Sequence, residues 1–120
     1  MSIPVEPVPA PRPRVSKFGT YFPANYTAHK KALEAALPPK AQTLLGELRV
    51  EVELVCPPIT KSKFTTPKGD LDNLAKPILD VLTKLGWYGD DRQIVELHIT
   101  KRFPKPGEQP HINVSLLEIQ

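Results

Sequence analysis

The sequence predicts a small single-domain α+β protein, in which a mixed or antiparallel β-sheet packs with two main α-helices. Its 120 residues leave room for one hydrophobic core. Three stretches alternate apolar and polar residues with the period of a strand, and two longer stretches carry apolar residues at helical spacing. Apolar residues make up 40% of the chain and charged residues 24%, as is usual for a soluble globular domain.

The first half of the chain begins with a Pro/Arg-rich segment, residues 1–23. Five of the fifteen prolines lie between positions 4 and 13, so we expect a short edge strand near Ile3 and then an extended stretch to Arg14. A short strand or turn is expected at 19–22, and a helix follows at 24–37. This helix ends at Pro38-Pro39, because a residue before proline avoids helical geometry.

Three strands are expected in the rest of the chain, at 47–56, 94–103 and 111–119. In the second of them, Val95, Leu97 and Ile99 are predicted to face the core. The last two strands are separated only by a proline- and glycine-containing turn, so we expect them to pair as an antiparallel hairpin with a long loop.

A second helix is expected at 71–85. Its apolar residues fall on one continuous arc, whereas Asp72, Lys76 and Asp80 fall on the opposite face, one turn apart from each other. Pro77 lies inside this helix and has no N–H, so it should leave the carbonyl of Asn73 without its helical partner.

Charge is distributed unevenly along the chain. The net charge is only +3, but residues 1–69 carry ten Lys or Arg against five Glu and no Asp. All five aspartates lie between residues 70 and 91. A basic body with one cluster of carboxylates suggests an anionic partner that is met at a cation-binding site.

The carboxylates occur as two pairs, Asp70 with Asp72 and Asp90 with Asp91. The first pair has a purely structural explanation, in which both acids favour the start of a helix and Asp72 pairs with Lys76. The second pair weighs against it, because several neighbouring carboxylates repel one another unless a cation lies between them. Oxygen ligands of this kind suit Mg²⁺ or Mn²⁺ rather than zinc.

These motifs resemble the RusA-like Holliday junction resolvases. The resemblance rests on Asp70-Leu71-Asp72-Asn73-Leu74 with Lys76, then Asp80, and then Asp90-Asp91-Arg92-Gln93-Ile94. The early Pro/Arg stretch, Tyr21-x-Pro23 and Tyr26 also agree in order and spacing. The resemblance implies a RusA-like homodimer that cleaves branched DNA and depends on Mg²⁺.

The same resemblance implies roles for individual residues. Asp70, Asp72 and Asp91 match the metal-binding carboxylates, and Lys76 matches a lysine that assists at the scissile phosphate. All four are therefore predicted to be catalytic. The chemistry agrees, because hydrolysis of a phosphodiester needs a metal to activate water and a cation to offset developing charge.

Carboxylates alone would repel DNA, so phosphate-binding cations are required as well. The candidates lie in the N-terminal segment and in the loop before the second helix: Arg12, Arg14, Lys17, Lys61, Lys63 and Lys68. Each of them has the alternative explanation of a solvated surface charge.

Two functions remain open from the sequence alone. The first is an endodeoxyribonuclease that resolves Holliday junctions by paired nicks, with four-way or branched DNA as its substrate. The second is a non-catalytic nucleic-acid-binding protein whose aspartates are structural. A homodimer is expected for the nuclease, because a four-way junction has two-fold symmetry and two equivalent strands to cut.

The sequence also predicts where the protein acts. No stretch of eighteen apolar residues is present, so we expect no membrane span, and the N-terminus does not read as a secretory signal. Cys56 is the only cysteine, which excludes an intramolecular disulfide framework. We therefore expect a cytoplasmic protein of a bacterium or of a phage in its bacterial host.

Overall fold

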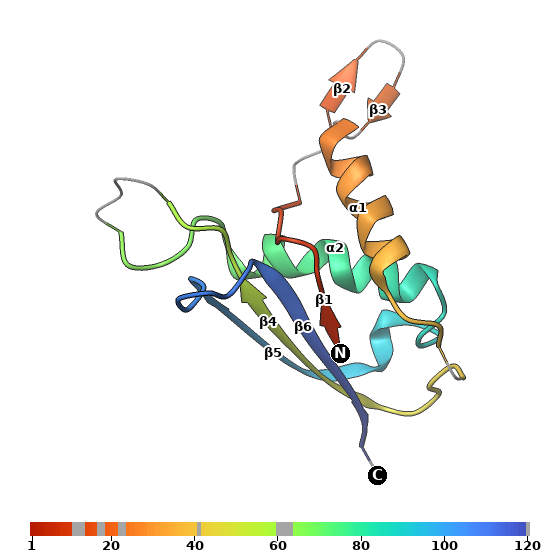
Figure 1. Cartoon of the computed structure of the whole chain (residues 1–120). Coiled ribbons are helices and arrows are strands. Elements are labelled where there is room, and N and C mark those ends of the chain that lie inside the picture. The colour runs from red at the N-terminus through yellow and green to blue at the C-terminus, as the bar shows by residue number, and fades with distance from the viewer. Residues whose placement is uncertain (11–13, 17–18, 22–23, 41, 60–63, 120) are drawn as a thin grey trace.

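The computed structural model describes residues 1–10, 14–16, 19–21, 24–40, 42–59 and 64–119. Figure 1 shows a twisted sheet, a helix α2 lying along one side of it, and a second helix α1 that crosses α2. The α+β prediction, with a mixed sheet and two main helices, is confirmed. None of the described helices is long and apolar enough to cross a membrane.

The main sheet contains four strands in the order β1-β6-β4-β5. β4 lies inside the sheet, where it pairs antiparallel with β6 and parallel with β5. A separate antiparallel hairpin, β2 with β3, lies beyond the start of α1 (Figure 1). The elements are β1 Ser2–Ile3, β2 Arg14–Ser16, β3 Gly19–Tyr21, α1 Ala24–Ala36, β4 Leu48–Val55, α2 Leu71–Lys84, the 3-10 helix η1 Asp91–Gln93, β5 Ile94–Arg102 and β6 His111–Glu118.

The predicted hairpin between the last two strands is wrong. β5 and β6 lie on opposite sides of β4 rather than beside each other. The reason is that β4, α2 and β5 form a parallel crossover unit. The helix α2 returns the chain to the end of the sheet at which β4 began, so that β5 runs parallel to β4. The connection over residues 103–110 then passes across the end of β4, which a tight hairpin turn would not reach.

The core lies between α2 and the inner face of the sheet. Leu48, Val50, Val52 and Leu54 alternate along β4 and are almost fully buried, whereas Arg49 and Glu51 point to the other, exposed face. The buried face of α2 packs against them with Leu74, Ala75, Pro77, Ile78, Val81 and Leu82. Cys56 is 4% exposed and belongs to the same core.

The prediction that β5 buries its apolar side chains is also wrong in part. Val95 is 54% exposed and Leu97 is 44% exposed, although Ile99 is partly buried. β5 is an edge strand, so it has a neighbour on one side only, and a bulge next to Leu48 places Val95 outside the regular pairing. An apolar strip on β5 is therefore left uncovered beside α2.

Pro77 affects α2 as expected. It is buried inside the helix, and the Asn73 carbonyl, which lacks its usual partner, accepts a hydrogen bond from the backbone N–H of Ala10 at 2.8 Å. The gap in the helical ladder is thus filled by the Pro-rich N-terminal segment. This bond holds that segment against the first turns of α2, next to the predicted catalytic residues.

Candidate active site

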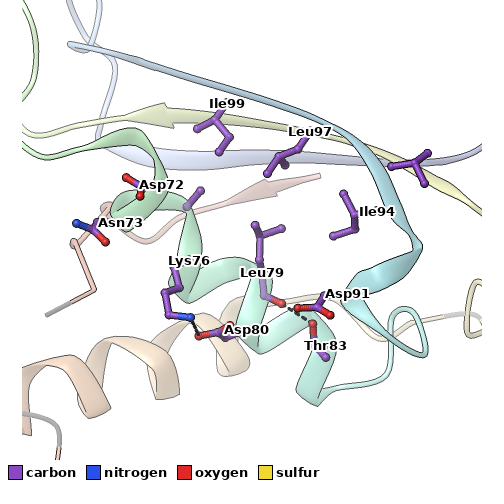
Figure 2. Close-up of a pocket in the computed structure, with 12 residues that line it drawn as sticks. Asp72, Asn73, Lys76, Leu79, Asp80, Thr83, Asp91, Ile94, Leu97 and Ile99 are labelled. Carbon is purple, nitrogen blue, oxygen red and sulfur yellow. Dashed lines mark hydrogen bonds and ion pairs between the residues drawn. The ribbon is translucent and has the colours of Figure 1, made fainter. Parts of the chain in front are cut away.

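A cavity of about 460 Å³ lies between α2 and the uncovered strip of β5 (Figure 2). One wall is polar and comes mainly from α2, and the other is apolar and comes mainly from β5. The lining residues include three of the four predicted catalytic residues, Asp72, Lys76 and Asp91. The helix period explains the polar wall, because residues four apart share one face.

Lys76 has a different partner from the one that the structural explanation assumed. Its ammonium lies 3.6 Å from a carboxylate oxygen of Asp80, one turn further along α2, rather than pairing with Asp72. The two side chains are 58% and 40% exposed. An exposed pair of this kind contributes only about 0.3–0.5 kcal/mol, so stability gives little reason for a lysine at this position.

Asp70 stands at the N-cap of α2, but its side chain does not cap the helix. Its backbone is extended, with φ −83° and ψ 144°, and the carboxylate makes no capping hydrogen bond. Its carbonyl accepts the N–H of Leu74 at 2.9 Å, as the first bond of the helix. The residue is exposed, so its carboxylate remains accessible to a ligand from solvent. Asp70 is not among the residues that line the cavity.

Asp90 behaves in the opposite way. Its carboxylate accepts the backbone N–H of Arg92 at 2.9 Å, and its own N–H donates to the Gln93 side chain at 2.9 Å. The N–H of Arg92 is the main cause that holds the pKa of the Asp90 carboxyl below its ordinary value. Asp90 therefore caps η1, and its neighbour Asp91 is the acid of this pair that faces the cavity.

Gln93 fixes the turn that carries Asp91. Its side-chain oxygen accepts the N–H groups of Gly89 and Asp90, and its side-chain nitrogen donates to the carbonyls of Leu44 at 3.0 Å and Gly46 at 2.9 Å. Both N–H groups of the amide and both lone pairs of its oxygen are thus committed to backbone groups. This binds the Asp91 turn to the segment before β4.

Asp91 lies beside the second half of α2, close to Leu79 and Thr83 (Figure 2). The hydroxyl of the buried Tyr88 lies at the same part of α2. It donates to the Leu79 carbonyl at 3.0 Å and accepts from the Thr83 hydroxyl at 2.9 Å. Burial is the main cause that raises the pKa of Tyr88, and the negative charges of Asp91 and Asp80 raise it further.

The three predicted metal ligands are not gathered at one point. An α-helix rises about 1.5 Å per residue, so Leu79 and Thr83 lie about 10 Å and 16 Å along the axis from Asp72. Oxygen ligands of one Mg²⁺ must each lie about 2.0–2.1 Å from it. Within the described part of the chain, no group of three or more His, Cys, Asp or Glu side chains is placed to hold a metal ion. The described part of one chain therefore does not gather all three carboxylates around one point.

Two comparisons with known proteins bear on the family of the chain. Residues 4–116 match the family model described as "Endodeoxyribonuclease RusA". The chain belongs to the RusA family. It is also similar to a protein of Lactococcus phage r1t named "Crossover junction endodeoxyribonuclease rusA", with 39% identity over 57 residues. That match covers 48% of this chain and 41% of the phage protein, so the chain spans less than half the length of that relative. The predicted RusA resemblance is thereby confirmed.

The predicted DNA contacts of this RusA-family chain are described only in part. Lys68 is exposed in the loop before α2, and the backbone of Arg14 begins β2. Arg12, Lys17, Lys61 and Lys63 lie outside the described residues. The cationic surface therefore stays a prediction.

Two features of the site were not assigned from the sequence. Gln93 belongs to the family motif, but its contacts cross from η1 to residues 44–46, which no local pattern indicates. Lys101, near the end of β5, donates to the Gly69 carbonyl at 2.6 Å. A lysine on the inner side of an otherwise apolar strand was the only available signal for it.

Proposed function

We propose that this chain is a metal-dependent endodeoxyribonuclease that resolves Holliday junctions by paired nicks, in DNA recombination and repair. The observation that carries the proposal is the cavity shared by Asp72, Lys76 and Asp91 in a member of the RusA endodeoxyribonuclease family. The alternative, a binding protein with structural aspartates, gives no reason for leaving the Asp70 side chain out of the helix cap.

The proposed metal is Mg²⁺, with Mn²⁺ as a possible substitute, and its proposed ligands are Asp70, Asp72 and Asp91. When bound, such an ion lowers the pKa of a water molecule and offsets charge on the phosphate. Accessible carboxylate oxygens fit a hard cation, but a single chain does not bring these three together. Lys76 holds a compact ammonium with three donors at the same cavity, where we expect it to stabilise charge on the scissile phosphate.

We infer that a homodimer completes the site. The exposed Val95 and Leu97 of β5 lie on the same cavity as the acids, so a second copy packed there would bury an apolar strip. In a two-fold dimer with the two α2–β5 faces antiparallel, the first turn of α2 in one copy would meet Asp91 of the other. Each site would then combine Asp70 and Asp72 of one chain with Asp91 of its partner.

The DNA is proposed to be four-way or branched. Arg12, Arg14, Lys17, Lys61, Lys63 and Lys68 are the proposed phosphate contacts. They belong to the N-terminal segment and to the loop before α2, and both segments lead to the start of α2, where Ala10 bonds to Asn73 and Lys68 precedes Asp70. The exposed Lys68 would bring a phosphate toward the proposed catalytic residues.

Product mapping on a synthetic four-way junction, with and without Mg²⁺, tests the activity. We expect symmetric nicks in two opposing strands that require the metal. Junction binding without nicking at any Mg²⁺ or Mn²⁺ concentration would leave only the binding-protein alternative.

Mixed dimers test the shared site. Asp70→Asn and Asp91→Asn are each expected to be inactive alone. In a co-expressed mixture, a shared site leaves one intact site per mixed dimer, formed by Asp70 of one chain and Asp91 of the other, so single nicks should return. If each site is built within one chain, every site in the mixture carries a substitution, and the mixture should stay inactive.

A further inference from the structure

Lys101 occupies an unusual place for a lysine. It pairs in register with Leu54, which is fully buried, and it follows Leu97 and Ile99 on the side of β5 that faces α2. The side chain is partly buried, and its positive charge lowers the pKa of the Cys56 thiol against the larger, raising effect of burial. Among the described residues, its ammonium has no carboxylate within ion-pair distance; its hydrogen bond runs to the carbonyl of Gly69 at 2.6 Å.

The Gly69 carbonyl belongs to the peptide unit that leads into Asp70. Because that unit is planar, a donor that fixes the carbonyl also fixes the N–H and the Cα of Asp70. Gly69 itself has φ +99°, and a Cβ added there would lie 3.3 Å from the Leu74 side chain, so the turn admits little besides glycine. The chain thus enters α2 through a tight turn that is held from outside by Lys101.

Asp70 needs such an external restraint. Its carboxylate makes no capping bond, so no side-chain contact of that kind fixes its direction, in contrast to Asp90. Its position depends on the backbone, through the Leu74 bond on one side and the Gly69 peptide on the other.

We propose that Lys101 is a positioning residue for Asp70: its hydrogen bond to the Gly69 carbonyl holds the Gly69–Asp70 peptide against edge strand β5, in the orientation in which Asp70 takes part in binding a divalent cation. The proposal rests on the proposed function, since it concerns the same site. Lys101 acts through Asp70 and is not itself expected to touch DNA or metal.

The test measures Mn²⁺ binding to the full-length protein by isothermal titration calorimetry, without DNA. Lys101→Met keeps the length and apolar stem of the side chain but removes the donor. Substitutions of groups that orient metal ligands weaken metal binding on the order of 10- to 100-fold, and we expect a loss of this size. Lys105→Met, at an exposed lysine beyond the end of β5, is the matched control and should bind Mn²⁺ as the wild type does.

A double-mutant cycle distinguishes positioning from a general structural effect. If Lys101 acts through Asp70, then Lys101→Met should add no further loss of Mn²⁺ affinity to Asp70→Asn. Losses that add would overturn the proposal, and so would an unchanged Mn²⁺ affinity in Lys101→Met. If Lys101→Met does not fold, Lys101→Gln is measured instead, whose shorter amide cannot keep the bond; an unchanged affinity in that variant overturns the proposal equally.

Cleavage separates this inference from the proposed function. In single-turnover cleavage of a four-way junction, Lys101→Met should need on the order of 10- to 100-fold more Mg²⁺ and should recover most of its rate at saturating metal, with unchanged junction affinity. A wild-type protein that never cleaves would refute the proposed function. A wild type that cleaves, together with a Lys101→Met variant of normal Mg²⁺ requirement, would refute the role of Lys101 alone.

Discussion

The two acidic turns begin alike in sequence and differ in structure. In each, a glycine precedes an aspartate with extended backbone at the start of a helix, Asp70 before α2 and Asp90 before η1. The Asp90 carboxylate is used by the fold, since it accepts the N–H of Arg92, whereas the Asp70 carboxylate makes no capping bond. The same dipeptide thus yields one acid that caps a helix and one whose carboxylate makes no capping bond.

The turns also differ in how they are held. The Asp91 turn is fixed from within, because Gln93 bonds to Gly89 and Asp90 and then reaches the carbonyls of Leu44 and Gly46. The Asp70 turn is fixed from outside, by the ammonium of Lys101 on β5. The side chain that holds the Asp91 turn thus belongs to that turn, whereas the side chain that holds the Asp70 turn comes from another strand.

The largest expected effect is the loss of junction cleavage when a proposed metal-binding aspartate is replaced, in contrast to the helix-capping Asp90. Asp70→Asn, Asp72→Asn or Asp91→Asn should each abolish junction cleavage while junction binding survives or tightens, because a metal ligand and one charge that repels phosphate are both lost. Asp90→Asn should keep most of the activity, since asparagine also caps a helix. Cleavage and gel-shift assays on one junction measure both. Wild-type cleavage by any of the first three variants would remove that residue from the site.

The second-largest effect on cleavage is expected for Lys76. Lys76→Ala is expected to lose on the order of 10²–10³ in single-turnover rate, as when a single donor to a developing oxyanion is removed, and to keep metal and junction binding. Lys76→Arg should restore only part of the rate, because a planar guanidinium differs from a compact ammonium.

A thermal melt run beside the kinetics shows whether Lys76 is only a partner of Asp80. Breaking that exposed pair should cost about 0.3–0.5 kcal/mol in the free energy of unfolding. A lower melting temperature with a normal rate would reduce Lys76 to a surface ion-pair partner.

Substitutions of Gln93 test whether its side-chain amide holds the Asp91 turn in place. Gln93→Ala should slow cleavage on the order of 10- to 100-fold through displacement of Asp91, as for groups that orient metal ligands. It should also lower the free energy of unfolding by about 1–3 kcal/mol, because backbone groups lose their partners. Gln93→Glu cannot donate to Leu44 and Gly46 and should not restore the rate, whereas Gln109→Ala, an exposed control, should behave as the wild type. Normal cleavage by Gln93→Ala would show that Asp91 does not depend on this amide.

The smallest expected effect is the pH dependence of the stability that the Asp90 carboxylate contributes. Its pKa is lower in the fold than its ordinary value of 3.8, so its contribution to stability is complete above that value and is lost as pH falls through the folded-state pKa. The melting-temperature difference between wild type and Asp90→Asn should therefore be constant near neutral pH and shrink below about pH 3.8. Glu108, whose pKa is lowered to about 2 chiefly by Arg102, titrates in both proteins and cancels in this difference. An equal difference at pH 3 and pH 6 would contradict the capping role.

The local features of this protein follow from short stretches of its amino-acid sequence. Period-2 and helical patterns place β4, α2 and β6 to within a residue or two, because alternation and the 3.6-residue turn are properties of short stretches of chain. The released carbonyl of Asn73 follows from the covalent structure of Pro77 alone. The family motif likewise depends only on spacing, and it predicts Asp70, Asp72, Lys76 and Asp91 as site residues.

The relations between distant stretches depend on how the whole chain packs. The parallel pairing of β5 with β4 depends on where α2 packs, and the position of β5 at the sheet edge leaves Val95 and Leu97 exposed. The choice of Asp80 over Asp72 by Lys76, and the bonds from Gln93 and Lys101, depend on side-chain directions and on partners between 3 and 49 positions away. Helical periodicity places Lys76 one turn from both Asp72 and Asp80 without choosing between them. It contains no information about the bonds from Gln93 to Leu44 and Gly46 or from Lys101 to Gly69, because those depend on how distant stretches pack. For the same reason, the motif could name three carboxylates but not show that the described part of one chain does not gather them around one point.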